Sequence, residues 1–180
     1  MALGQYASGQ KSSKIDEHGV YRNTELGFSF TTPSGLRDVT SAAGPSEKPD
    51  PNTVALLLFE LSGPNSDQLD WRGMAVQSYP RDQVSTTDDF EAETRMSKTI
   101  IGNKVTETVP PTKVTIKDLA YALSRFQRTH GVVTEYSHVY TTIIHGHLVA
   151  FAFTANAESQ AEAMAEVLKT VEVKAERSSK

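Results

Sequence analysis

The chain has 180 residues, of which 38% are hydrophobic and 22% charged, so it can form one domain whose core needs no disulfide or metal. Its 22 acidic and 18 basic residues give a net charge of -4, which disfavours nucleic acid and anionic lipid surfaces as partners. The absence of cysteine excludes disulfides, thiolate metal sites and cysteine nucleophiles, and the ordinary apolar content predicts no membrane span.

Both ends of the chain are polar. We predict a flexible leader over residues 1–18, a single domain over residues 19–174 and a polar tail over residues 175–180. The opening residues 1–6 lack the basic and apolar regions of a signal peptide. Two compartments therefore stay open: a periplasmic or secreted location if a signal peptide has been removed, and the cytoplasm otherwise.

The first half of the chain predicts strands. Short apolar runs at residues 19–23 and 26–31 flank a tight turn and predict a hairpin. Residues 37–52 hold three prolines and little apolar periodicity, which is typical of a long surface loop whose functional role stays open. The almost continuous apolar run at 53–61 predicts a central strand covered on both faces, and residues 71–79 predict the next strand.

A helix is predicted after these strands. Thr86 and Asp89 have the spacing of a capping box, in which two side chains satisfy the first backbone N–H groups of a helix. We expect the helix to extend to about Lys98 and to stop at Gly102-Asn103.

The stretch after this helix is harder to assign. The secondary structure of residues 105–111 is ambiguous, and Pro110-Pro111 is expected to prevent regular structure at their end. Alternating side chains over residues 116–129 favour a strand, with a helix as the competing interpretation.

The clearest pattern is a hairpin over residues 136–155. Two alternating runs flank His145-Gly146, whose glycine can supply the positive φ of a two-residue turn. The resulting register pairs Tyr140 with Phe151 and places His138 on the same, aromatic face. The other face carries smaller side chains, over which a helix backbone can approach closely.

A final helix, with Asn156 as its N-cap, is predicted because apolar residues recur at helical spacing from Ala157 to Val171. We expect this helix to cover one face of the hairpin and the helix after Asp88 to cover the other. The order of elements predicts an α+β fold, mainly an antiparallel β-sheet flanked by helices.

The histidines do not form a convincing metal site. His138, His145 and His147 share one hairpin, but His138 and His147 lie about 20 Å apart at roughly 3.3 Å per residue. The two histidines at the turn are fewer than the protein ligands of an ordinary zinc site. We therefore expect no metal and no cofactor.

Other catalytic patterns are missing as well. The sequence contains no G-x-S-x-G elbow, P-loop or G-x-G-x-x-G pattern, so neither a serine nucleophile nor a phosphate cradle is predicted. The acidic residues at 88–93 are explained by helix capping and the helix dipole. Enzymatic activity stays undecided, and no pattern in the sequence favours it.

Two further residues are candidates for a binding surface. Arg125 has an aromatic and a basic neighbour, but these are too few for a nucleic-acid footprint. Trp71 could anchor a partner, because aromatic residues are enriched at interface hot spots, or it could belong to the core. With His138, Tyr140 and Phe151 of the aromatic face, they complete the set of candidate ligand or partner residues.

Two segments resemble a known superfamily. Residues Tyr21 to Asn23, Leu26 to Phe30 and Pro33 to Leu36 resemble the opening hairpin of the Mog/PsbP/DcrB-like superfamily, with Leu36 where its members usually have tryptophan. Residues 135–173 resemble its last hairpin, final helix and short closing strand. Together the two segments cover roughly half of the chain.

The resemblance implies an antiparallel sheet sandwiched between helices, the Mog/PsbP-like α/β/α sandwich. The relatives include photosystem accessory subunits, a nuclear import factor and bacterial envelope lipoproteins, and most are not enzymes. The resemblance implies no catalytic residues, because the superfamily shares no catalytic motif. A lipid anchor of the lipoprotein kind is not predicted, because the chain has no lipobox cysteine.

These observations lead to three hypotheses. We expect a non-catalytic binding or accessory domain of bacterial origin, which contacts a protein partner or a small ligand through a sheet surface or the 37–52 loop. The alternative is a small-molecule-binding or hydrolytic protein with a pocket beside the aromatic face of the hairpin. Self-association into a homo-oligomer through strand edges is the third hypothesis.

Overall fold

The computed structural model describes residues 13–40, 54–61, 69–102 and 104–175. The α-helices are α1 (Asp89–Ile101) and α2 (Glu158–Met164), and the 3-10 helices are η1 (Arg81–Gln83) and η2 (Ala165–Thr170). The strands are β1 (Ser13–Ile15), β2 (Val20–Asn23), β3 (Phe28–Thr31), β4 (Arg37–Asp38), β5 (Val54–Leu61), β6 (Leu69–Pro80), β7 (Thr106–Ile116), β8 (Leu119–His130), β9 (Val133–Ile144), β10 (His147–Ala155) and β11 (Glu172–Val173).

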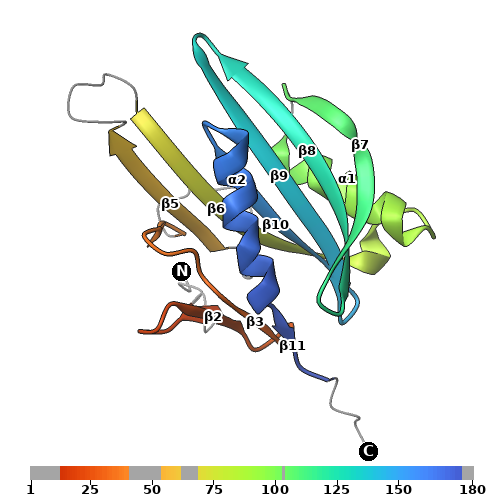
Figure 1. Ribbon diagram of the computed structural model, residues 1–180. Coiled ribbons are helices and arrows are strands. Elements are labelled where there is room, and N and C mark those ends of the chain that lie inside the picture. The colour runs from red at the N-terminus through yellow and green to blue at the C-terminus, as the bar shows by residue number, and fades with distance from the viewer. Residues whose placement is uncertain (1–12, 41–53, 62–68, 103, 176–180) are drawn as a thin grey trace, which may run out of the picture.

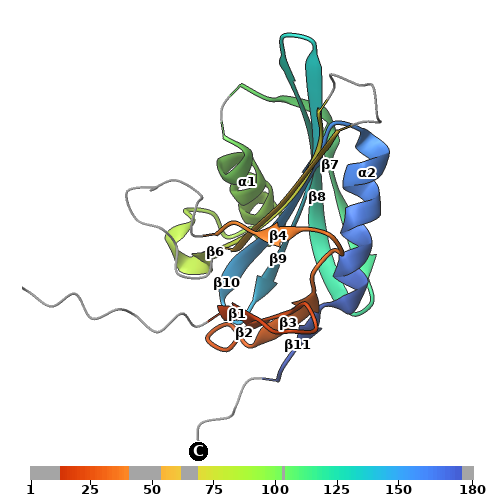
Figure 2. The same cartoon turned by 90° about the vertical axis from the view of Figure 1, so that its left-hand side faces the viewer.

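These elements form a layered α+β structure, as predicted. A seven-stranded sheet has the order β4-β5-β6-β10-β9-β8-β7, and a four-stranded sheet has the order β1-β2-β3-β11. Helix α1 lies on one face of the large sheet, and helix α2 lies on the other (Figures 1 and 2). The small sheet lies at one end of α2 and helps to cover the same face of the large sheet. In the described part of the chain, no helix is long and apolar enough to span a membrane.

The β9–β10 hairpin lies in the large sheet with the register that the sequence predicts. Tyr140 pairs with Phe151, and His138 pairs with Phe153. His145 (φ 46°) and Gly146 (φ 75°) both adopt the left-handed conformation, as a type I′ turn requires. This turn determines which side chains of the hairpin point to each face of the sheet.

The face of the large sheet beneath α2 is filled by aromatic side chains. Phe151 of β10 meets Phe28 and Phe30 of β3 edge-on, with ring centroids 6.1 and 5.7 Å apart. Tyr121 of β8 packs edge-on against Phe151 at 6.4 Å. The predicted apolar stripe of the last helix completes this core with Ala161, Met164, Leu168 and Val171. Burial of each aromatic side chain stabilises the fold by roughly 1.5–3 kcal/mol.

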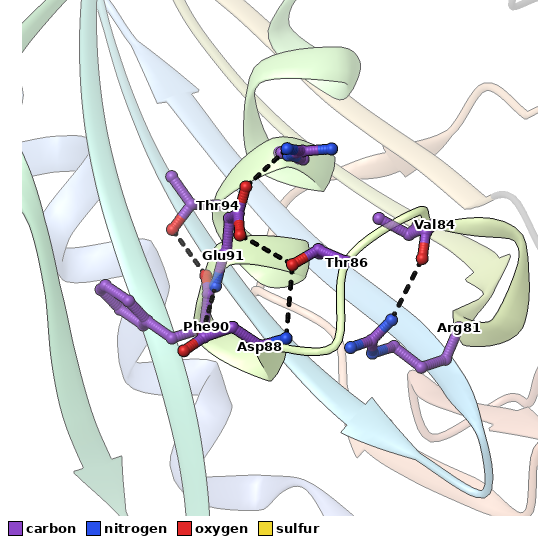
Figure 3. Close-up of polar contacts among 8 residues, drawn as sticks. Arg81, Val84, Thr86, Asp88, Phe90, Glu91 and Thr94 are labelled. Atoms are coloured by element: carbon purple, nitrogen blue, oxygen red, sulfur yellow. Dashed lines mark hydrogen bonds and ion pairs between the residues drawn. The ribbon is translucent and has the colours of Figure 1, made fainter.

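Helix α1 begins at an N-cap that differs from the predicted capping box. The Asp88 carboxylate accepts a hydrogen bond from the Glu91 backbone N–H at 2.9 Å (Figure 3). Thr86 instead donates to the Glu91 carboxylate at 2.7 Å. A charged acceptor satisfies an orphan N–H at the positive end of the helix dipole better than a hydroxyl does. The helix therefore starts at Asp89, and it continues beyond the expected Lys98 to Ile101.

The other face of the hairpin is covered by α1, as predicted. Ala92 and Met96 belong to one buried cluster with small and aliphatic side chains of β9 and β10. Ser97 is fully buried, and its hydroxyl shares a hydrogen bond with that of Thr141 at 2.9 Å. This bond satisfies both polar groups in the contact, so it avoids the cost of burying an unpaired hydroxyl.

The proline-containing stretch is a strand, contrary to expectation. Pro110 and Pro111 lie inside β7, which is an edge strand of the large sheet. The pairing of β7 with β8 shifts register between Glu107 and Val109 and again between Val109 and Thr112. These bulges accommodate residues that cannot donate to a ladder, and an edge strand needs hydrogen bonds on one side only. The helical alternative for residues 116–129 is also excluded, because β8 is a strand.

Two predictions for the first half of the chain are corrected. The apolar strand β5 is not central, because it lies next to the two-residue strand β4 at one edge. The apolar run indicates burial, whereas the strand order depends on long-range pairing. Arg37 and Asp38 of the predicted loop form β4, and residues 41–52 of that loop lie outside the described residues.

The predicted ends also differ in detail. Ser13 to Ile15 of the predicted leader pair with β2, so this part is ordered in a sheet, and residues 1–12 and 176–180 lie outside the described residues. The N-cap of α2 is Ala157, which makes no side-chain cap, and not Asn156. The apolar packing of α2 therefore stabilises this helix without a polar cap.

Candidate functional site

In the described part of the chain, the aromatic face is packed with side chains where the alternative hypothesis expects a pocket. Phe151 is 0% exposed, because Phe28, Phe30 and Tyr121 surround it. Tyr140 is 8% exposed and meets Tyr121 edge-on at 6.2 Å. The space beside this face is therefore filled by side chains from β3 and β8, a contact that was not predicted from the sequence.

His138 and Arg125 belong to the same filled face. They are cross-strand partners in β9 and β8. His138 is buried, and its Nε2 lies 3.4 Å from a carboxylate oxygen of Glu158 in the first turn of α2. Burial, and then the nearby Arg125, lower the pKa of the His138 imidazole. His138 and Glu158 therefore form a structural contact between the sheet and α2.

An open groove lies on the opposite face, which α1 covers only in part. The groove has a volume of about 370 Å³ and runs between the C-terminal end of α1 and strands β6 and β10. Gly73 pairs with Thr154, and Ala75 pairs with Ala152, so the sheet presents small side chains here. These residues leave the space that larger side chains fill elsewhere on the sheet.

The walls of the groove are mostly apolar. Ile100 and Ile101 come from the end of α1, and Phe126 comes from β8. Trp71 of β6 also lines the groove and is partly exposed, so it is the one candidate residue from the sequence analysis that lies in this site. The hydroxyls of Ser137 and Thr154 share a hydrogen bond of 2.8 Å at the groove.

One end of the groove carries two charged residues. Arg128 of β8 and Glu135 of β9 are cross-strand partners, and both line the groove. The Arg128 guanidinium donates from Nη2 to the backbone carbonyl of Ile101 at 2.7 Å. The last carbonyl groups of a helix have no N–H partner within the helix, and this bond satisfies one of them at the end of α1. Arg128 therefore fixes the position of the helix end that forms the groove wall.

A smaller cavity of about 320 Å³ lies near the first turns of α1. Glu93, Asp89 and Lys113 line it, and Lys113 places its ammonium 5.1 Å from the centre of the Phe90 ring. Burial, and next the carboxylate of Asp89, raise the pKa of Glu93 to about 7. A carboxyl with such a pKa can exchange protons near neutral pH. Within the described residues, no group of three or more His, Cys, Asp or Glu could hold a metal ion.

One sequence pattern, small residues on one face of two neighbouring strands, could have indicated the groove. Gly73 and Ala75 alternate on one face of a predicted strand, and Ala152 lies on the small-residue face of the predicted hairpin. A patch of small side chains on a sheet marks either close helix packing or an open surface. Only close helix packing was predicted for this face of the hairpin, and the structure contains both a packed helix and an open surface.

The fold belongs to a recognisable class, the α+β sandwiches with an antiparallel sheet between helices. The chain has the PsbP-like fold of this class, as the resemblance implied. No family model and no curated protein matches the sequence.

Similarity was found to several solved structures. The cyanobacterial PsbP (CyanoP) of Synechocystis sp. PCC 6803 superposes with a TM-score of 0.53 at 16% identity, covering 97% of this chain and 98% of that chain. A protein of Bacteroides thetaiotaomicron VPI-5482 gives a TM-score of 0.46 at 16% identity over 83% of this chain, which covers 46% of that chain. LpqN, involved in cell envelope biogenesis of Mycobacterium tuberculosis, gives 0.46 at 9% identity, covering 80% of this chain and 82% of that chain.

Proposed function

We propose that the chain is a non-catalytic binding domain that holds a small, largely apolar molecule in the groove beside α1. The observation that carries this proposal is the groove itself, a space of about 370 Å³ lined by Trp71, Phe126 and the isoleucines at the end of α1. Ligand pockets in proteins are commonly apolar clefts of roughly 300–1,000 Å³ with a few polar groups. The volume therefore suits one small molecule.

The shape of the groove favours a flat ligand. Gly73, Ala75 and Ala152 project at most one carbon atom from the sheet, so a ring can approach the backbone. Trp71 offers a partly exposed aromatic surface on the β6 side, and the buried Phe126 lines the groove on the β8 side. Burial of apolar ligand surface against these groups supplies the main driving force for binding.

The polar groups of the groove favour binding over catalysis. Ser137 and Thr154 share their hydroxyl hydrogen bond with each other, and Arg128 donates to a backbone carbonyl. Among the described residues that line the groove, none is a histidine that could activate a hydroxyl as a nucleophile. The hydrolytic alternative therefore has no histidine base among the described residues at this site.

Several sequence predictions stay predictions under this proposal. They are the bacterial origin, a protein partner, self-association, the compartment and the single domain over residues 19–174. A small ligand and a protein partner are compatible, because an accessory domain can use one surface for each.

Trp71 gives a direct test, because it is the only tryptophan of the chain. We expect neutral biphenyl-4-methanol to shift the single indole N–H signal in a ¹H–¹⁵N spectrum in a saturable manner. Ala75→Phe, which fills the groove, should abolish the shift, whereas Thr115→Phe on the exposed side of β7 should preserve it.

The spectra also report whether each variant is folded, through the dispersion of the remaining signals. A folded Ala75→Phe variant that still shows the saturable shift would overturn the proposal. The same conclusion follows if neither biphenyl-4-methanol nor related ring compounds move the indole signal of the parent protein.

A further inference from the structure

We propose that the ligand of the groove is a neutral molecule carrying a carboxamide-type group, which lies between Arg128 and Glu135. This inference rests on the proposed function, since it names the chemistry of the molecule that the groove would hold. It starts from the two opposite charges at one end of an otherwise apolar groove.

Arg128 and Glu135 point to the same side of the sheet. They are direct cross-strand partners, and side chains at such positions leave the sheet on one face with Cβ atoms about 5 Å apart. Despite this proximity, the two side chains form no ion pair within 4.0 Å among the described residues. The two side chains therefore line the groove without forming an ion pair with each other.

The reason lies at the end of α1. Arg128 turns toward the helix, where its Nη2 donates to the Ile101 carbonyl at 2.7 Å. The negative end of the helix dipole favours a guanidinium in this position. Arg128 Nε is buried without an acceptor among the described residues, so the donors of the side chain are not all satisfied. The half-buried carboxylate of Glu135 is left with no hydrogen-bond or ion-pair partner in the described part of the chain.

This arrangement discriminates between ligand charges. A carboxylate that approached Arg128 would also meet Glu135, and an ammonium that approached Glu135 would also meet Arg128. Like charges in contact cost binding free energy, and such repulsion is a common source of specificity. A neutral carboxamide avoids both penalties, because its carbonyl accepts from the guanidinium while its N–H donates to the carboxylate.

Three probes with one ring system test this inference: biphenyl-4-carboxamide, biphenyl-4-carboxylate and biphenyl-4-methylammonium. We expect the carboxamide to bind about tenfold more tightly than either charged probe. A loss of affinity of this order is expected for a mismatched charge in a partly solvated site. Calorimetry gives the affinities, and the Trp71 indole signal confirms that each probe occupies the groove.

The variant Glu135→Gln is decisive, because it removes one charge and leaves the contact between Arg128 and α1 in place. We expect it to shift the preference toward the carboxylate, whereas Glu172→Gln on the exposed strand β11 should change nothing.

Tighter binding of either charged probe to the parent protein, or equal binding of all three, would overturn the inference and leave the proposed function standing. Failure of Glu135→Gln to favour the carboxylate would also overturn it. If no biphenyl compound moves the Trp71 signal, the proposed function itself fails.

Discussion

Replacing Glu93 by glutamine is expected to stabilise the protein at pH 8 and to leave its stability at pH 4 almost unchanged. Burial, and next the carboxylate of Asp89, raise the pKa of Glu93 to about 7 from an ordinary value of 4.5. The folded protein therefore holds this proton more tightly than the unfolded chain does. The stabilisation that comes from this protonated Glu93 carboxyl is fully present below pH 4.5 and is lost as the pH rises through about 7.

The expected size follows from the difference between the two pKa values. A gap from 4.5 to about 7 corresponds to about 3 kcal/mol for a fully shielded group. Glu93 is only half-buried, so solvent screening reduces this to about 1 kcal/mol. In a domain of this size, such a change raises the melting temperature by about 2–4 °C.

Thermal unfolding followed by circular dichroism at pH 4 and pH 8 measures the effect. Glu91→Gln is the matched control in the same helix, because hydrogen bonds from Thr86 and Arg95 lower the pKa of the exposed Glu91. Glu91→Gln should lower the melting temperature at pH 8 or leave it unchanged. The reasoning is refuted if Glu93→Gln melts no higher than the parent at pH 8, or if its gain is the same at both pH values.

Three further predictions concern the core, a turn and acid stability. Phe151→Ala should lower the free energy of unfolding by about 3–5 kcal/mol in urea titrations, whereas Val132→Ala, at a position 101% exposed, should stay within about 0.5 kcal/mol; equal effects would contradict the described core. Gly27→Ala should lower the melting temperature more than Gly102→Ala does. Both glycines have positive φ, but only at Gly27 would a Cβ lie 3.0 Å from a histidine ring, so equal melting temperatures would count against this contact. His138→Leu should reduce the loss of stability between pH 7 and pH 5, because burial lowers the pKa of His138 and the folded state resists its protonation; an unchanged pH profile would exclude this cause.

The parts of the fold that could be predicted are those with strong local patterns. The β9–β10 register followed from the alternating side chains on both sides of His145-Gly146, because a two-residue turn allows only one pairing of the two strands. The apolar spacing from Ala157 to Val171 likewise predicted a helix and its buried stripe. β7 was missed because an edge strand has little apolar alternation, and its prolines matched the rules for a chain break.

The site was harder to predict than the fold. Trp71 lines the groove, but Tyr140 and Phe151 lie on the opposite face within the core. Aromatic alternation cannot distinguish a ligand surface from a filled core, because both require apolar side chains. The extent of the groove depends on how far α1 reaches across a twisted sheet, which is set by long-range packing. The role of Arg128 depends on its contact with Ile101, far away along the chain.

The prolines of β7 also affect how molecules of this protein meet one another. An exposed strand edge offers a row of N–H and C=O groups to which another strand can be added, which is the usual start of sheet-mediated aggregation. Pro110 and Pro111 have no backbone N–H to donate, so the row is interrupted at these residues, and the adjacent bulges disturb its spacing. An incoming strand can therefore find no long uninterrupted ladder along β7, which disfavours the addition of a further strand at this edge.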